Sequence, residues 1–175
     1  MIVYIYGGVS SGKSQYAENL ISQLYSNKIY LATMENKGNI AKKRIDKHRL
    51  QRKDMGFKTI EEGKNIRTVD IEQDSNILLE DLTNLLCNNI FYEGGLRIDY
   101  KKITESIFSD IIALEQRVNS VFIVGNDVFS TNRNSGKELD IFLDCLYCLH
   151  SKLYDLSEWV IEVIYGLPCY RKKND

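Results

Sequence analysis

Short apolar stretches recur along this chain and alternate with segments whose apolar residues are spaced three to four positions apart. The short stretches are rich in β-branched and aromatic residues, which is typical of buried strands, and the longer spacing is typical of amphipathic helices. The pattern predicts strands at residues 2–6, 28–34, 77–82, 121–125 and 159–165, and helices after residue 14 and near 39–54, 83–93, 99–119 and 136–155. Strands that alternate with helices predict an α/β fold, in which a mostly parallel sheet carries helices on both faces.

Neither a linker nor an internal repeat interrupts this alternation, so we expect residues 1–175 to form one domain. The only proline, Pro168, lies after the last predicted strand. The formal net charge of −1 gives no overall bias toward nucleic acid or membrane surfaces. No apolar run approaches the roughly 20 residues that span a bilayer, and a strand rather than a signal peptide is expected at the N-terminus. We therefore expect a cytoplasmic protein with no nucleic-acid or membrane partner.

A glycine-rich segment follows the first predicted strand directly. It reads Gly7-Gly8-Val9-Ser10-Ser11-Gly12-Lys13-Ser14, which matches the P-loop pattern G-x-x-x-x-G-K-[ST]. Glycine at the two fixed positions permits backbone angles that a Cβ would forbid, so the loop can wrap closely around an oxyanion. The loop N–H groups and the N-terminus of the next helix then offer hydrogen bonds and partial positive charge to phosphate. We expect Lys13 to reach the β- and γ-phosphates of a nucleotide and the Ser14 hydroxyl to bind Mg²⁺.

Two carboxylates, Glu80 and Asp81, end the apolar run that begins at residue 77. A P-loop site needs an acid on a neighbouring strand to hold Mg²⁺ or its water shell. Because successive strand residues point to opposite faces, we expect one of the two to face the phosphates, Glu80 first and Asp81 second. The alternative is a strand that simply ends in two solvated acids. Asp127, after the fourth predicted strand, is a candidate for a substrate or metal contact, or for a carboxylate that only stabilises a local turn.

Four cysteines are present, and two of them, Cys145 and Cys148, form a C-x-x-C pair. This spacing occurs in zinc and redox sites, but here it lies in a predicted apolar helix, and no second pair completes a metal site. We therefore expect reduced thiols buried in the core.

Residues 39–54 form a strongly basic segment, with seven lysines and arginines against two aspartates. Such a run usually forms a solvated helix face, and it can also attract a polyphosphate. The segment contains His48, one of only two histidines. A neutral imidazole can act as a nucleophile, and cationic neighbours would lower its pKa and neutralise charge that builds on a phosphate. Taken alone, the pattern favours an exposed histidine with no catalytic role.

Distinctive segments extend along nearly the whole chain. They read GGVSSGKSQYAENL from residue 7, IYLATM from 29, RIDKHRLQR from 44, FKTIEE from 57, ILLEDLTNLLCNN from 77, VGNDV from 124 and GLPCYRK from 166. In this order they resemble the bifunctional adenosylcobinamide kinase / adenosylcobinamide-phosphate guanylyltransferase family of cobalamin biosynthesis. The P-loop alone would not identify this family, but R-I-x-x-H, T-x-E and acid-x-L-T-x-x-x-x-N beside it are fairly specific.

The resemblance implies a RecA-like P-loop NTPase fold and two reactions. In the first, ATP or GTP phosphorylates the aminopropanol hydroxyl of adenosylcobinamide. In the second, GTP donates GMP to adenosylcobinamide phosphate through a guanylylated histidine, and pyrophosphate is released. His48 occupies the position of that histidine, and Glu61, in the T-x-E element, matches an acid expected near the nucleotide; the alternative for Glu61 is an exposed acid on a short strand. The resemblance also implies that subunits associate as a homotrimer.

Two regions depart from the family pattern. After VGN, where the family usually has a glutamate and then glycines, this chain has Asp127 followed by residues 128–133, which contain no glycine. The next helix keeps Asp144 of a D-x-x-G-x-x-N pattern but has Tyr147 and His150 at the other two places. His150 is either a polar substitute for asparagine or a helix-surface residue, and we favour the second. These changes concern the corrinoid side or a subunit contact more than the nucleotide side.

Two further hypotheses therefore stay open. One is a P-loop small-molecule kinase that kept the fold but changed its acceptor. The other is a non-catalytic nucleotide-binding relative, which the altered residues 128–150 suggest and the intact P-loop, Glu80 and His48 argue against. No N-K-x-D element that would select guanine stands out, so the preference between ATP and GTP rests on resemblance alone.

Overall fold

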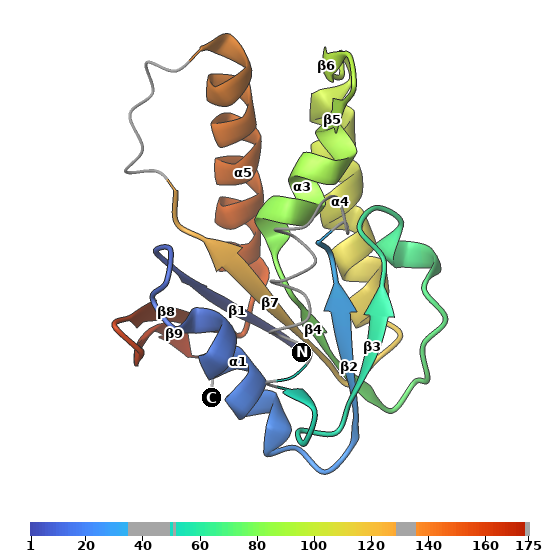
Figure 1. Ribbon diagram of the computed structural model, residues 1–175, viewed down its shortest axis with the longest axis vertical. Coiled ribbons are helices and arrows are strands. Elements are labelled where there is room, and N and C mark those ends of the chain that lie inside the picture. The colour runs from blue at the N-terminus through green and yellow to red at the C-terminus, as the bar shows by residue number, and fades with distance from the viewer. Residues whose placement is uncertain (35–49, 51, 129–135, 174–175) are drawn as a thin grey trace.

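The computed structural model of the protein describes residues 1–34, 50, 52–128 and 136–173 (Figure 1). The strands are β1 (Ile2–Gly7), β2 (Asn27–Ala32), β3 (Phe57–Glu61), β4 (Ser75–Leu79), β5 (Phe91–Tyr92), β6 (Gly95–Leu96), β7 (Ser120–Asn126), β8 (Trp159–Ile164) and β9 (Leu167–Lys173). The helices are α1 (Lys13–Ser22), α3 (Leu82–Ile90), α4 (Tyr100–Glu115) and α5 (Lys137–Leu156), with a short 3₁₀ helix η1 (Ile66–Thr68).

Seven of the described strands form one sheet in the order β3-β2-β4-β7-β1-β8-β9, and β5 and β6 form a small separate hairpin. Neighbouring strands of the large sheet are parallel, except for β8 and β9, which are antiparallel. Parallel strands end at the same edge of a sheet, so the segments that follow β1, β3, β4 and β7 meet along one edge. Ligands bind at this edge in open α/β sheets.

Helices cover both faces of the sheet (Figure 1). On one face, Ala17 and Ile21 of α1 pack with Val3 and Ile5 of β1. On the other face, α3, α4 and α5 pack over a larger apolar core that includes Tyr4. Successive strand residues point to opposite faces, so β1 contributes alternate residues to the two cores. Because both faces are covered, β4 and β7 are buried almost throughout and their apolar residues are consecutive, which explains why their sequences show no polar alternation.

The predicted fold class is confirmed: the chain is a P-loop α/β structure with a mostly parallel sheet and helices on both faces. The helices predicted near 83–93, 99–119 and 136–155 are present as α3, α4 and α5, with ends that differ by a few residues. The helix predicted at 39–54 lies largely outside the described residues.

Three details of the prediction are wrong. The third strand ends earlier, at Leu79, because the Asp81 side chain accepts hydrogen bonds from the N–H groups of Thr83 and Asn84 and so begins α3. The edge strands β3 and β9 are absent from the predicted set, because much of each is exposed and polar. Pro168 lies inside β9 rather than beyond the last strand, and an edge strand tolerates a proline because the outer side of its backbone needs no ladder hydrogen bonds.

A buried ion pair joins Arg52 to α1. The side chains of Arg52 and Glu18 are 5% and 4% exposed, and Nη1 of Arg52 lies 3.4 Å from Oε1 of Glu18. The guanidinium carbon also lies 3.3 Å from the centre of the Tyr30 ring, which is a cation–π contact. Burial raises the pKa of the Glu18 carboxyl, and Arg52 opposes this rise. The pair therefore ties Arg52 to the α1 face of the sheet.

Removing one member of this pair should be costly. We expect Arg52→Met to lower the free energy of unfolding by roughly 3 kcal/mol at pH 8, because Glu18 would stay buried without its partner. Without Arg52, the native pKa of Glu18 would lie further above its unfolded value. The variant therefore loses stability as pH rises through that native pKa, so its loss relative to wild type should be smaller at pH 5 than at pH 8. Urea unfolding at both pH values measures this.

Arg97→Met is the matched control, because Arg97 pairs with Asp99 at 3.3 Å on an exposed surface. Exposed pairs contribute about 1 kcal/mol or less, so this variant should unfold close to wild type at both pH values. Equal losses for Arg52→Met and Arg97→Met, or a loss at position 52 that does not change with pH, would contradict the account of the buried pair.

Candidate functional site

The P-loop joins β1 to α1 and is shaped by its own backbone. The Ser11 N–H donates to the Gly8 carbonyl at 3.2 Å, and Gly12, with φ of 90°, directly precedes α1. A positive φ of this size suits glycine and strains other residues. Ser10 also has a positive φ, 59°, within this tight turn. The strand, loop and helix that the motif requires are therefore all present.

The loop packs against the hairpin of β8 and β9. A Cβ on Gly7 would overlap the Val163 carbonyl oxygen, and a Cβ on Gly12 would lie 3.1 Å from the Gly166 Cα. The Gly166 N–H donates to the Ser11 carbonyl at 2.7 Å. Both fixed glycines of the motif thus allow close packing, in addition to the backbone conformation for which they were predicted.

Sequence reasoning missed this supporting hairpin. Ile164 and Leu167 pair directly, so Tyr165 and Gly166 form a two-residue turn, and their φ values of 49° and 80° are both positive. This turn type matches the right-handed twist of a hairpin, and asparagine or aspartate followed by glycine is its usual sequence signal. A tyrosine at the first place made that signal weak.

Hydrogen-bond donors gather where α1 begins. Lys13 is buried, and its ammonium donates to the Gly8 carbonyl at 3.1 Å. The first turn of α1 has no side-chain cap and no acidic residue, so its N–H groups and the positive end of the helix dipole are available to an anion. The Ser11 hydroxyl is buried and has no hydrogen-bond partner among the described residues. Ser14 lies in the first turn of α1. Together, these N–H, ammonium and hydroxyl groups can donate hydrogen bonds to the oxygen atoms of a polyphosphate.

Glu80 and Asp81 follow β4 and have different neighbours. Leu78 packs on the α1 face, so Glu80, two residues later, lies on that face, where it is hydrogen-bonded to the Tyr30 hydroxyl. Burial raises the pKa of the Glu80 carboxyl, and the hydrogen bond from Tyr30 opposes the rise. Asp81 caps α3 through Oδ1, and its Oδ2 accepts a hydrogen bond from Asn126 at 2.9 Å. Asp81 therefore joins α3 to β7, whereas Glu80 lies on the side of the P-loop helix.

The other predicted acids lie along the same edge. Glu61 is the exposed last residue of β3. Four strand spacings separate β3 from β1, so Glu61 lies about 19 Å along the edge from the P-loop. Asp127 follows β7, which neighbours β1, and its backbone N–H donates to the Gly7 carbonyl at 2.9 Å. The turn that carries Asp127 is thus tied to the P-loop. His48 lies outside the described residues.

On the face opposite α1, His150 contacts β1. Its Nδ1 is hydrogen-bonded to the Tyr4 hydroxyl at 2.7 Å, and the two rings meet edge to face with centres 5.5 Å apart. Burial lowers the pKa of His150 to about 4, and nearby Asp127 opposes this shift, so the imidazole is neutral at neutral pH. His150 therefore links α5 to β1, and is not the helix-surface residue that the sequence favoured.

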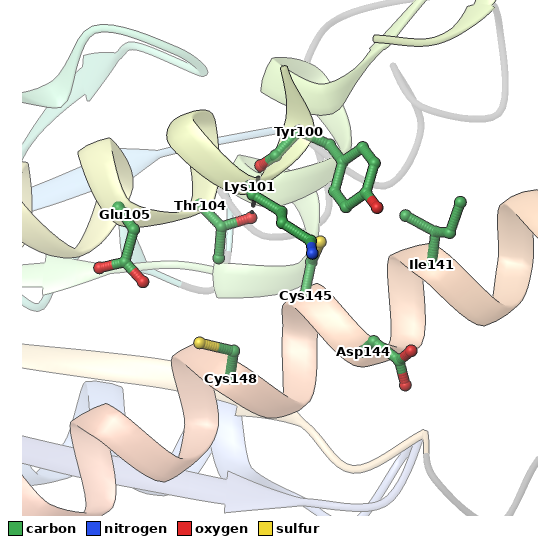
Figure 2. A pocket seen from close by; sticks show the side chains of 8 residues that line it. All are labelled: Tyr100, Lys101, Thr104, Glu105, Ile141, Asp144, Cys145 and Cys148. Carbon is green, nitrogen blue, oxygen red and sulfur yellow. Dashed lines mark hydrogen bonds between the residues drawn. The ribbon is translucent and has the colours of Figure 1, made fainter. Parts of the chain in front are cut away.

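The C-x-x-C pair lies between α4 and α5 (Figure 2). Cys145 is buried, Cys148 is half-buried and both are free; with Lys101 and Thr104 of α4 they line a cavity of about 370 Å³. Burial raises the pKa of the Cys145 thiol, so this thiol is protonated at neutral pH and is a poor nucleophile and metal ligand. The expectation of reduced thiols in the interior is confirmed for Cys145, and Cys148 is partly open to solvent.

Comparison with known proteins identifies the family. Residues 3–170 match the family described as cobinamide kinase / cobinamide phosphate guanyltransferase. The chain belongs to this family. The resemblance inferred from the motifs is thereby confirmed, and membership of this family makes the chain a P-loop transferase.

Two relatives of the family match most of the chain. Each is 32% identical over 139 residues, which is 73% of this chain and 76% of the relative. Both are called bifunctional adenosylcobalamin biosynthesis protein CobU; one is from Escherichia coli (strain K12) and the other from Salmonella typhimurium (strain LT2).

A solved structure shows the same fold. It is a prototypical ATPase from the type III secretion system of pathogenic bacteria, with a TM-score of 0.54 and 12% identity. The match covers 97% of this chain and 56% of the ATPase chain, so this protein spans little more than half of that length. At this identity the likeness concerns the fold alone. In the described part of the chain, no helix combines the length and apolar character needed to cross a membrane.

The burial of His150 gives a prediction about pH. Its native pKa of about 4 lies below the ordinary value, so the unfolded chain binds a proton that the folded chain does not. This contribution to stability is complete above about pH 6.5 and is lost as pH falls toward 4. We expect the imidazole C–H resonance that disappears in His150→Gln to titrate in NMR spectra with a midpoint near 4. A midpoint near 6.5 would show that the ring is solvated.

Proposed function

We propose that this protein is an adenosylcobinamide kinase and adenosylcobinamide-phosphate guanylyltransferase. It transfers the γ-phosphoryl group of ATP or GTP to the aminopropanol hydroxyl of adenosylcobinamide, and then GMP from GTP to the phosphorylated product. The observation that carries the proposal is the P-loop in a chain of this family: the buried Lys13 and the uncapped start of α1 lie at the carboxyl edge of the sheet.

In the kinase step, residues 7–14 bind the nucleotide. Their N–H groups and the Lys13 ammonium hold the β- and γ-phosphates and stabilise the charge that develops as the γ-phosphoryl group leaves. Ser14 and Glu80 would hold Mg²⁺, with Asp81 as the second acid. Such a site needs only one or two carboxylates besides phosphate oxygens and water, and Glu80 and Asp81 supply two. When bound, Mg²⁺ would supply positive charge that offsets the negative charge developing on the phosphates.

In the guanylyltransferase step, His48 is the nucleophile. An imidazole nitrogen attacks the α-phosphorus of GTP, the bond between the α-phosphorus and the bridging oxygen breaks, and pyrophosphate leaves while the P-loop holds it. A phosphate oxygen of adenosylcobinamide phosphate then attacks the same phosphorus and breaks its bond to nitrogen, which returns a free imidazole. The covalent intermediate divides one difficult transfer into two easier steps. The basic residues around His48 in the sequence would offset the negative charge of the transferred group.

The position of Glu61 suggests its role. A carboxylate about 19 Å from the P-loop is too distant to contact the β- and γ-phosphates, but an extended nucleoside triphosphate covers much of that span. We assign Glu61 to the ribose or base end of the bound nucleotide. Resemblance to the family supports a homotrimer, in which neighbouring subunits could complete the site.

Lys13→Ala tests the shared phosphate site. It should reduce both cobinamide phosphorylation and GMP transfer by roughly 10³-fold, because both steps stabilise phosphate charge through this one ammonium. Steady-state rates with labelled ATP and GTP measure the effect, and circular dichroism checks the fold. Lys102→Ala, on the exposed surface of α4, is the control and should leave both rates unchanged. Loss of one activity alone would show that the two reactions do not share the P-loop.

A labelling experiment tests the histidine intermediate. GTP labelled in the α-phosphate should leave an acid-labile, base-stable label on the protein without any corrinoid, whereas GTP labelled in the γ-phosphate should not. His48→Ala should abolish the label. His150→Gln, which changes the only other histidine, should keep it, because this half-reaction needs no acceptor. A label that survives His48→Ala would refute the nucleophile assignment, and kinase activity with no label would favour a kinase with a changed acceptor.

A further inference from the structure

An open cavity of about 440 Å³ lies between β1 and α5, on the face of the sheet opposite α1. Four tyrosines, which are Tyr4, Tyr6, Tyr147 and Tyr154, form most of its wall. His150 and Asp155 also line it. Its volume is in the range of small-molecule sites. None of these tyrosines belongs to the P-loop site, and Tyr147 and His150 are the two positions at which the helix departs from the family pattern.

The wall of the cavity is aromatic but carries polar groups. The Tyr4 and Tyr6 rings are stacked, with centres 5.7 Å apart and planes 16° apart. Tyr147 is 62% exposed, so a ligand in the cavity could contact much of its ring. Each tyrosine combines an apolar ring with a hydroxyl that can donate and accept. Such a surface suits a ligand with an apolar body and amide or hydroxyl groups at its rim.

The residues that line the cavity offer little positive charge to a nucleotide phosphate. Asp155 contributes a carboxylate, and no lysine or arginine is among the described residues that line it. His150 adds no positive charge at neutral pH, since burial lowers its pKa to about 4. Two cations lie at the rim rather than among the lining residues: Arg171, which is hydrogen-bonded to Tyr6, also donates through Nε to Glu162 at 2.7 Å, and the Lys172 ammonium donates to the Asp155 carbonyl at 2.8 Å. Tyrosine rings beside a carboxylate favour an uncharged or cationic ligand.

The cavity adjoins the start of the P-loop. Tyr6 immediately precedes Gly7, and the turn at Asp127 that holds Gly7 is close enough to His150 to affect its pKa. A molecule in the cavity therefore lies beside the carboxyl end of β1, on the other side of the sheet from α1. A flexible chain on that molecule could extend across the edge of the sheet toward the phosphates.

We propose that this tyrosine-lined cavity binds the corrinoid acceptor by one edge of its ring, with amide side chains hydrogen-bonded to the tyrosine hydroxyls. The inference rests on the proposed function, which supplies a ligand of the required chemistry. A corrin monoanion with cobalt(III) and one alkyl ligand carries a net positive charge, and amides surround its ring. A whole corrinoid is larger than the cavity, so only one edge enters, and the aminopropanol chain is left free to reach the P-loop.

The experiment compares binding of the acceptor with binding of the nucleotide in the full-length chain. Tyr147→Ala removes an exposed ring from the cavity with little risk to folding, and Asp155→Asn removes the charge without changing volume. Tyr92→Ala is the matched control, because Tyr92 is 61% exposed and lies on β5, outside the cavity. The KM for adenosylcobinamide, the KM for ATP and kcat are measured for each variant. Equilibrium dialysis with adenosylcobinamide, which is coloured, gives the affinity without any nucleotide.

We expect Tyr147→Ala to raise the KM and the dissociation constant for adenosylcobinamide by about tenfold, Asp155→Asn to raise them about threefold, and both to leave the KM for ATP unchanged. Tyr92→Ala should match wild type. If wild type phosphorylates adenosylcobinamide but neither cavity variant changes its KM, the inference is wrong and the proposed function stands. If wild type neither binds nor phosphorylates it, both are wrong. If Tyr147→Ala changes only the oligomeric state in light scattering, the cavity is a subunit contact and the inference is overturned.

Discussion

The close approach of two backbones, at Gly7 and at Val163, is the constraint on which the site depends. A side chain at position 7 would occupy the space of the Val163 carbonyl oxygen, so only glycine lets β1 end against β8 in this way. Gly12 makes a second close approach, to Gly166 in the turn of the β8–β9 hairpin. Between these two points the chain has little freedom, which fixes the start of α1 and the buried Lys13 relative to the sheet. A rigid cradle of this kind stabilises phosphate charge without having to reorganise.

The two faces of the sheet present different chemistry to the same edge. The α1 face carries charged and ionisable groups: Glu18, Arg52 and Glu80 surround Tyr30 in a buried setting, and Arg52 pairs with Glu18. The opposite face carries the tyrosines and the neutral His150. β1 belongs to both faces and ends in the P-loop. The charged and the aromatic surfaces thus meet at the edge of the sheet where the P-loop begins, which is where the proposed nucleotide and acceptor sites would adjoin.

Much of the fold followed from local pattern. The inner strands are buried on both faces, so they appear in the sequence as short uninterrupted apolar runs, and the P-loop motif predicted the strand, loop and helix that frame the candidate phosphate site. The capping of α3 by Asp81 was also predictable in principle, since an aspartate before a helical segment is a common N-cap. The strand predicted at 77–82 extended past Asp81, so this cap was not recognised.

Other features depend on contacts between distant parts of the chain and have no local signal. The pairing of Arg52 with Glu18 joins residues 34 positions apart. The strand order that separates Glu61 from the P-loop is set by the crossovers rather than by any one strand. The contact of His150 with Tyr4 joins residues 146 positions apart, so the sequence around His150 alone indicated a helix surface. The edge strand β9 was hidden by its proline and its basic residues.

The most direct test is a crystal structure of the protein with a non-hydrolysable GTP analogue and Mg²⁺. The account predicts the β- and γ-phosphates within hydrogen-bond distance of Lys13 and the N–H groups at the start of α1, Mg²⁺ between Ser14 and Glu80, and the ribose or base directed toward Glu61. A triphosphate bound elsewhere, with residues 7–14 free of ligand, would contradict it.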